Sequence, residues 1–194
     1  MKEDEADLSA KREQDLRETF EAVGRAMAQW AIIERGLGIA FSQALKADLH
    51  PCQRVFSAPT SFGAKNSLLK AAIEAGVERW PEDLVYCDRM KFYLDCANKA
   101  GQWSSVRNRL AHGEATILIE RGDYLGGVVS PLRTDRKYSD NIVTLKAVID
   151  SAEYFRRLGI LIMKCSFSDS VHDMNDLRSS FKELPKEPFQ TRQD

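Results

Sequence analysis

The chain has 194 residues, 43% of them hydrophobic, which is enough for one domain of ordinary size with its own core. Lysine and arginine number 28 and aspartate and glutamate 29, so the net charge is −1 and any contact with RNA or DNA has to be local. No apolar run approaches the roughly 20 residues of a membrane span, and the charged N-terminus is unlike a signal peptide. We therefore expect a cytoplasmic protein that does not enter membranes.

The cysteines indicate a reducing compartment and no metal centre. They form no CxxC pair and no cluster with histidine at the spacing of zinc ligands. His50 and Cys52 lie close together, but two candidate ligands in one loop are too few for a site. The sequence therefore predicts free thiols, no metal and no cofactor. The four cysteines are Cys52, Cys87, Cys96 and Cys165.

Charge and turn residues predict one domain over residues 15–180. Residues 1–14 are highly charged and are expected to form an N-terminal extension. Residues 181–194 contain two prolines among mostly polar residues, a composition typical of a disordered tail.

Apolar residues at alternating spacings of three and four predict a long first helix that ends near Leu49, before a proline. Glu34 stands in this stripe where an apolar residue belongs, so its carboxylate needs a partner. Three glycines within the helix favour close approach by another helix or a local bend. The predicted seam is Phe20, Val23, Met27, Trp30, Glu34, Leu37, Phe41 and Leu45, and the glycines are Gly24, Gly36 and Gly38.

The remaining pattern is also mostly helical, with one change of period that predicts a β-hairpin over about residues 115–130. The expected fold class is therefore mainly α, an up-and-down helical bundle with one β-hairpin inserted before the last long helix. In chain order we expect a turn-rich linker at 50–63, a helix at 64–74 stopped by Gly76, helical segments at 82–98 and 101–112 that are separate or kinked, the hairpin around the turn at 121–123, a polar loop at 133–141, a long helix at 144–165 and a short one at 171–181.

Residues 107–112, which read RNRLAH, carry the clearest chemical signal. They place a guanidinium, a carboxamide and an imidazole on about one and a half turns of helix. Leu110 continues an apolar stripe from Trp103, so Asn108 and His112 are expected on the opposite side of the helix. Polar groups held outward on a packed helix indicate a surface groove or a second subunit.

These residues resemble the signature of the HEPN superfamily, Arg-x4–6-His. Arg107, Asn108 and His112 match it, and Gly113 follows as it often does in the family. Residues 30–37 are similar to the Trp-x3-Glu-x2-Leu pattern of many small members. The resemblance covers roughly residues 15–165, and its diagnostic part is six residues long.

The resemblance implies a helical bundle that forms a homodimer, with two Arg/His motifs facing each other in one cleft. Many members are metal-independent endoribonucleases of toxin–antitoxin, phage-defence or RNA-processing systems, so RNA is the implied substrate and an antitoxin or another protein is a possible partner. Other members have degenerate sites and serve as binding modules. Some paired toxins carry a further tyrosine after the histidine, where this chain has residues 114–116, Glu-Ala-Thr.

The chemistry of the residues suits this inference. Histidine exchanges protons near neutral pH and can accept the proton of a ribose 2′-hydroxyl. Arg107 is expected to bind the phosphate, Asn108 to orient His112 or hold the phosphate, and Arg109 to attract phosphate from the flank. Glu34 is expected to pair with Arg107. The products are a 2′,3′-cyclic phosphate and a 5′-hydroxyl.

Each of these residues also has an ordinary structural explanation. Arg107 can be a surface arginine paired with Glu34 or another acid, and Asn108 a surface residue without a role. His112 beside Gly113 can be a helix cap that complements the helix dipole. Two functions therefore stay open: a dimeric ribonuclease, and a catalytically silent module that binds RNA, a nucleotide or a protein through the same groove.

Overall fold

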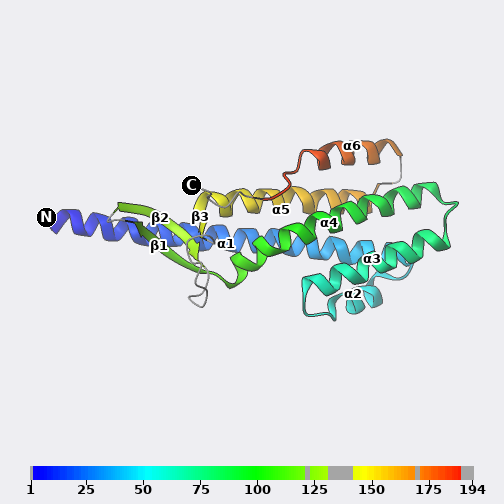
Figure 1. Ribbon diagram of the computed structural model, residues 1–194, viewed down its shortest axis with the longest axis horizontal. Coiled ribbons are helices and arrows are strands. Elements are labelled where there is room, and N and C mark those ends of the chain that lie inside the picture. Colours follow the sequence, from blue (N-terminus) through cyan, green and yellow to red (C-terminus); the bar gives the residue numbers. More distant parts are fainter. Residues whose placement is uncertain (1, 121–122, 131–141, 169–170, 189–194) are drawn as a thin grey trace. The chain divides into compact units, whose positions relative to one another are not determined.

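The computed structural model describes residues 2–120, 123–130, 142–168 and 171–188, and it is mainly helical with a small antiparallel sheet (Figure 1). The expected fold class, a mainly helical chain with a β-hairpin before the last long helix, is confirmed. The turn residues at 121–122 and the predicted loop at 133–141 lie outside the described residues. The elements are α1 (Lys2–Ala44), α2 (Leu49–Ser57), α3 (Phe62–Arg79), α4 (Leu84–His112), β1 (Glu114–Glu120), β2 (Asp123–Ser130), β3 (Val143–Thr144), α5 (Leu145–Ser166) and α6 (Val171–Lys182).

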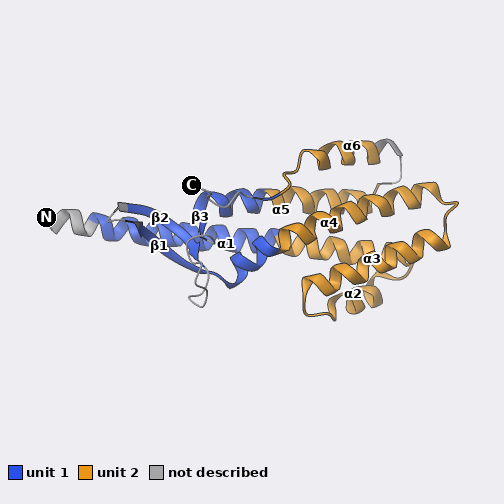
Figure 2. Cartoon of the chain, viewed as in Figure 1, with its two compact units in different colours: residues 1–29, 105–153, 187–194 blue, residues 30–104, 154–186 orange. Residues whose placement is uncertain are grey.

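The chain divides into two compact units (Figure 2). Unit 1 comprises residues 1–29, 105–153 and 187–194, and unit 2 comprises residues 30–104 and 154–186. Three helices, α1, α4 and α5, contribute a segment to each unit. The sequence analysis predicts a single domain over residues 15–180. It gives no sign of two units, because the helical periodicity continues across the boundaries between them.

Aromatic side chains form the centre of unit 2. The ring of Trp30 packs edge-on against Phe62 and Phe155, with ring centroids 4.9 and 5.0 Å apart. Trp103 lies 6.0 Å from Phe155 and donates from Nε1 to the carbonyl of Lys186 over 3.1 Å. The burial of these rings provides much of the hydrophobic stabilisation of the unit.

Glycines allow helices of unit 2 to approach closely. A Cβ on Gly36 would lie 2.6 Å from Cγ2 of Ile162, so α5 passes directly over this position, which is one of the two explanations that the sequence leaves open. Among the described residues, Gly24 has no neighbour outside its own helix backbone within 4 Å of a Cβ built there, so close approach is wrong for this glycine. Gly101, expected to mark a break or a kink, faces the amide nitrogen of Asn66, and α4 continues through it as one helix. Gly76, expected to end a helix, lies inside α3 against Tyr86. The predicted break at Gly101 and the predicted stop at Gly76 are wrong, because each glycine makes room for a neighbour within a continuous helix.

The sheet of unit 1 lies on the N-terminal part of α1. Strands β1 and β2 pair antiparallel, with Glu114 opposite Ser130 and an irregularity between Leu118 and Ile119, and β3 extends the sheet beside β2. A Cβ on Gly127 of β2 would lie 2.8 Å from the carbonyl oxygen of Asp15 in α1. The strand backbone therefore sits almost directly on the helix.

The predicted seam of the first helix is confirmed at Trp30, Leu37 and Phe41, which are buried, and is wrong at its two ends. Phe20 is 62% exposed and Leu45 is 41% exposed, although both belong to that seam. In unit 1 the buried positions of α1 are Thr19, Ala22 and Ala26. A Cβ on Gly127 of β2 would collide with Oγ1 of Thr19, so the strand backbone packs against α1 at this residue.

Two further boundaries need correction. The predicted linker at 50–63 contains helix α2, whose Phe56 is buried and packs 5.7 Å from Phe41, and Pro51 is tolerated because it lies in the first turn. The predicted tail at 181–194 begins too early, because α6 continues to Lys182 and Leu184 is buried. Residues 189–194 lie outside the described part of the chain.

Candidate active site

The predicted site residues Arg107, Asn108, Arg109 and His112 all lie at the C-terminal end of α4, within unit 1. Asn108 and His112 are exposed, whereas Arg107 and Arg109 are half-buried. The helix is anchored on its other side by the buried neighbours Val106 and Leu110. The outward orientation that the spacing predicts for Asn108 and His112 is therefore confirmed.

Arg107 and Asn108 are joined by a hydrogen bond. Nη1 of Arg107 donates to Oδ1 of Asn108 over 3.1 Å. Consecutive residues on a helix point about 100° apart, so the arginine side chain has to bend toward its neighbour. Since the amide oxygen faces the guanidinium, the amide nitrogen of Asn108 points away from it.

His112 is the last residue of α4, and the chain turns into β1 at Gly113. The backbone N–H of Gly113 donates to the carbonyl of Arg109 over 2.8 Å. A Cβ on Gly113 would lie 3.1 Å from the carbonyl oxygen of Ser130, so the end of β2 closes over the turn. This close packing fixes the position of His112. The basic groups of Arg109 and His112 also complement the negative end of the helix dipole.

Glu34 lies in unit 2, where Trp30 and Lys65 are among its partners. Nε1 of Trp30 donates to its Oε1 over 2.8 Å, and Nζ of Lys65 lies 2.9 Å from its Oε2. These contacts explain why a carboxylate is tolerated in an apolar stripe. Lys65 escapes sequence analysis because it is 31 residues away, on another helix. Arg107 belongs to the other unit, and its pairing with Glu34 stays a prediction.

A second polar cluster in unit 1, formed by Lys11, Asp15 and Tyr124, was not predicted. The hydroxyl of Tyr124 donates to Oδ2 of Asp15 over 2.5 Å, and Nζ of Lys11 lies 4.9 Å from the tyrosine ring centroid. Burial and the hydrogen bond to Asp15 raise the pKa of Tyr124 to about 12. The phenol therefore stays a neutral donor that ties the sheet to α1. Sequence spacing gives no signal for a pair 109 residues apart.

The described residues hold no group of three or more histidine, cysteine, aspartate or glutamate side chains placed to bind a metal ion. All four cysteines are buried free thiols. Within the same part of the chain, no helix is both long and apolar enough to span a bilayer.

Comparison of the chain with protein-family models, curated proteins and solved structures finds no match. The resemblance to the HEPN superfamily thus rests on the sequence motif alone.

Proposed function

We propose that this protein is a metal-independent endoribonuclease of the HEPN type that acts as a homodimer. The observation that carries the proposal is the end of α4, where exposed Asn108 and His112 stand one turn apart and Asn108 accepts a hydrogen bond from the Arg107 guanidinium. One side of this part of the helix is buried, and the helix ends at the tightly packed Gly113. The backbone that carries the three groups is therefore fixed. Fixed placement of catalytic groups is a large part of what lowers a reaction barrier.

The proposed reaction needs one group to accept a proton and one to donate a proton. His112 takes the proton of the ribose 2′-hydroxyl, and the 2′-oxygen attacks the phosphorus. The bond from phosphorus to the 5′-oxygen breaks, and that oxygen takes a proton from an acid. The products are a 2′,3′-cyclic phosphate and a 5′-hydroxyl. Each motif supplies one histidine, so a dimer with two facing motifs provides both a base and an acid.

Arg107 is proposed to bind the phosphate as negative charge develops on its oxygens. A guanidinium presents several N–H donors in a planar fork that suits phosphate. Its hydrogen bond to Asn108 positions it, and Arg109 on the flank adds positive potential. The proposal needs no metal, because the arginines supply the positive charge.

A catalytically silent module that binds RNA, a nucleotide or a protein through the same surface is the second candidate. The net charge of −1 favours it slightly, because proteins that bind long RNA are usually basic. The same charge also fits a ribonuclease with a small structured substrate.

Expression in a bacterial host separates the two candidates. The ribonuclease proposal predicts growth arrest that His112→Ala relieves. His50→Ala is the matched control, because His50 is exposed on α2 and lies outside the site. Normal growth with the wild-type chain favours the binding module. A strictly monomeric mass at micromolar concentration, measured by sedimentation, would contradict the shared site.

A further inference from the structure

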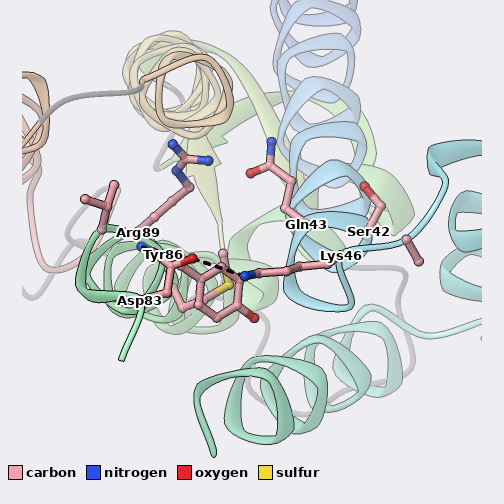
Figure 3. A pocket seen from close by; sticks show the side chains of 9 residues that line it. Ser42, Gln43, Lys46, Asp83, Tyr86 and Arg89 are labelled. Carbon is pink, nitrogen blue, oxygen red and sulfur yellow. Dashed lines mark hydrogen bonds and ion pairs between the residues drawn. The ribbon is translucent and has the colours of Figure 1, made fainter. Parts of the chain in front are cut away.

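A cleft of about 400 Å³ lies in unit 2, between the C-terminal end of α1 and the start of α4 (Figure 3). Its volume is within the roughly 300–1,000 Å³ typical of small-molecule sites. The proposed ribonuclease reaction does not use this cleft. The polar residues that line it are Ser42, Gln43, Lys46, Asp83, Tyr86 and Arg89.

One wall of the cleft holds a fixed cation. Nζ of Lys46 lies 3.1 Å from Oδ2 of Asp83, and 4.6 and 4.7 Å from the ring centroids of Trp80 and Tyr86. The backbone of Lys46 has a φ of +46°, a conformation in which glycine or asparagine is usual after a helix. A lysine therefore occupies a backbone conformation that is energetically unfavourable for it. Its ammonium group is held at the cleft by Asp83, Trp80 and Tyr86.

The other side presents Arg89 of α4 and Gln43 of α1, whose polar ends point away from the Lys46–Asp83 pair (Figure 3). Arg89 donates to the carbonyl of Ser168. Gln43 donates to the carbonyl of Ser166 over 3.0 Å and accepts from the hydroxyl of Tyr93 over 2.8 Å. These contacts hold the polar lining in place before any ligand arrives, which reduces the ordering cost of binding.

The charged side chains that line the cleft are two cations and one acid, Lys46, Arg89 and Asp83. Tyr86 donates its backbone N–H to Oδ1 of Asp83 over 3.0 Å, and Lys46 contacts the other oxygen. Both carboxylate oxygens are thus engaged, and the surplus charge is positive. Val85, 40% exposed, adds an apolar surface at the rim.

We propose that this cleft binds a small organic anion. The surplus positive charge of Lys46 and Arg89 in the lining attracts its phosphate or carboxylate group, and its apolar body packs against Val85. Arginine with lysine recognises either group through charge-assisted hydrogen bonds. The sequence gives no hint of this site, because its lining residues come from two segments of the chain about 40 residues apart.

Calorimetric titration of the full chain with adenosine monophosphate, inorganic phosphate and benzoate tests the proposal, with adenosine as the uncharged control. We expect saturable one-to-one binding of at least one anion and much weaker binding of adenosine. Binding of the phosphates alone identifies a phosphate site, and binding of benzoate alone a carboxylate site. Absence of saturable binding at millimolar concentrations, or equal affinity for adenosine and its monophosphate, overturns the proposal.

Two variants one residue apart locate the site without disturbing the core. Val85→Glu adds a negative charge at the rim and should weaken anion binding about fivefold, as expected for one charge at close range in water. Leu84→Glu adds the same charge at a residue that is 77% exposed and does not line the cleft, and it should leave the affinity unchanged. Both positions lie in the first turn of α4, where an acidic residue suits the helix dipole. Equal weakening by both variants, or loss of binding in Arg107→Ala, would mean that the anion binds elsewhere.

Discussion

Nη1 of Arg107 donates a hydrogen bond to Oδ1 of Asn108 over 3.1 Å, at the exposed end of α4. This contact turns the carboxamide so that its nitrogen points away from the guanidinium. In the proposed reaction, the amide nitrogen of Asn108 then presents an N–H donor to the substrate, and the guanidinium of Arg107 keeps a fixed orientation. Asn108 acts as a positioning residue for Arg107, whatever contact it makes with substrate.

Asn108→Ala is expected to reduce kcat/KM for RNA cleavage about tenfold, because a small misplacement of a charged group weakens transition-state stabilisation. The free energy of unfolding should change by less than about 0.5 kcal/mol, since the side chain is exposed. Steady-state kinetics and urea denaturation measure the two effects. An unchanged kcat/KM would remove Asn108 from the site.

The contact between Glu34 and Lys65 is predicted to stabilise unit 2. The two side chains are only 22% and 18% exposed, so Lys65→Met removes one cation from beside a half-buried carboxylate. We expect a loss of about 1–2 kcal/mol in the free energy of unfolding, less than for a fully buried pair. Lys70→Met, on the same helix, is the control variant. Equal stability of the two variants would show that the ion pair contributes nothing.

Glu34→Gln tests whether Glu34 also acts on Arg107. If the predicted pairing holds, Glu34→Gln lowers RNA cleavage by a larger factor than Lys65→Met does. Both variants are assayed at a temperature at which each is fully folded. Comparing kcat/KM of the two variants separates the roles. Cleavage that is the same in both assigns Glu34 to the stability of unit 2 alone.

Two glycines of α1 should respond to alanine in opposite directions. No atom outside the local helix backbone lies within 4 Å of a Cβ on Gly24, so Gly24→Ala should stabilise the chain by about 0.5–1 kcal/mol. Gly36→Ala meets the buried side chain of Ile162 and should destabilise by about 1–3 kcal/mol. Thermal unfolding of both variants checks the pair. Stabilisation by Gly36→Ala would contradict the close packing of α1 and α5.

Alkaline pH should weaken unit 1 through Tyr124. Its pKa is raised from 10.0 to about 12, so the folded state favours the neutral phenol. The stabilising contribution is fully present below pH 10 and is lost as the pH rises through about 12. Unfolding free energies of wild type and Tyr124→Phe, compared across this range, isolate the effect from other titrating groups. Parallel curves would show that the hydrogen bond to Asp15 does not favour the neutral form.

The sequence predicts the helices and the hairpin well, because periodicity is a local property. It misplaces the part of the buried face of α1 that lies in unit 1, because the strand backbone that sits on Asp15 and Thr19 comes about 110 residues later. The outward placement of Asn108 and His112 follows from spacing within one helix. The partners Lys65 and Tyr124 are missed because side-chain contacts between distant elements leave no local pattern.

Incubation of RNA with the purified protein in excess EDTA, followed by analysis of the product ends, tests the ribonuclease proposal most directly. The account predicts cleavage that yields 2′,3′-cyclic phosphate and 5′-hydroxyl ends, and that His112→Ala and Arg107→Ala both abolish. Arg54→Ala, at an exposed residue of α2, should cleave as the wild type does. Cleavage that survives both site substitutions, or that requires a divalent metal ion, would contradict the account.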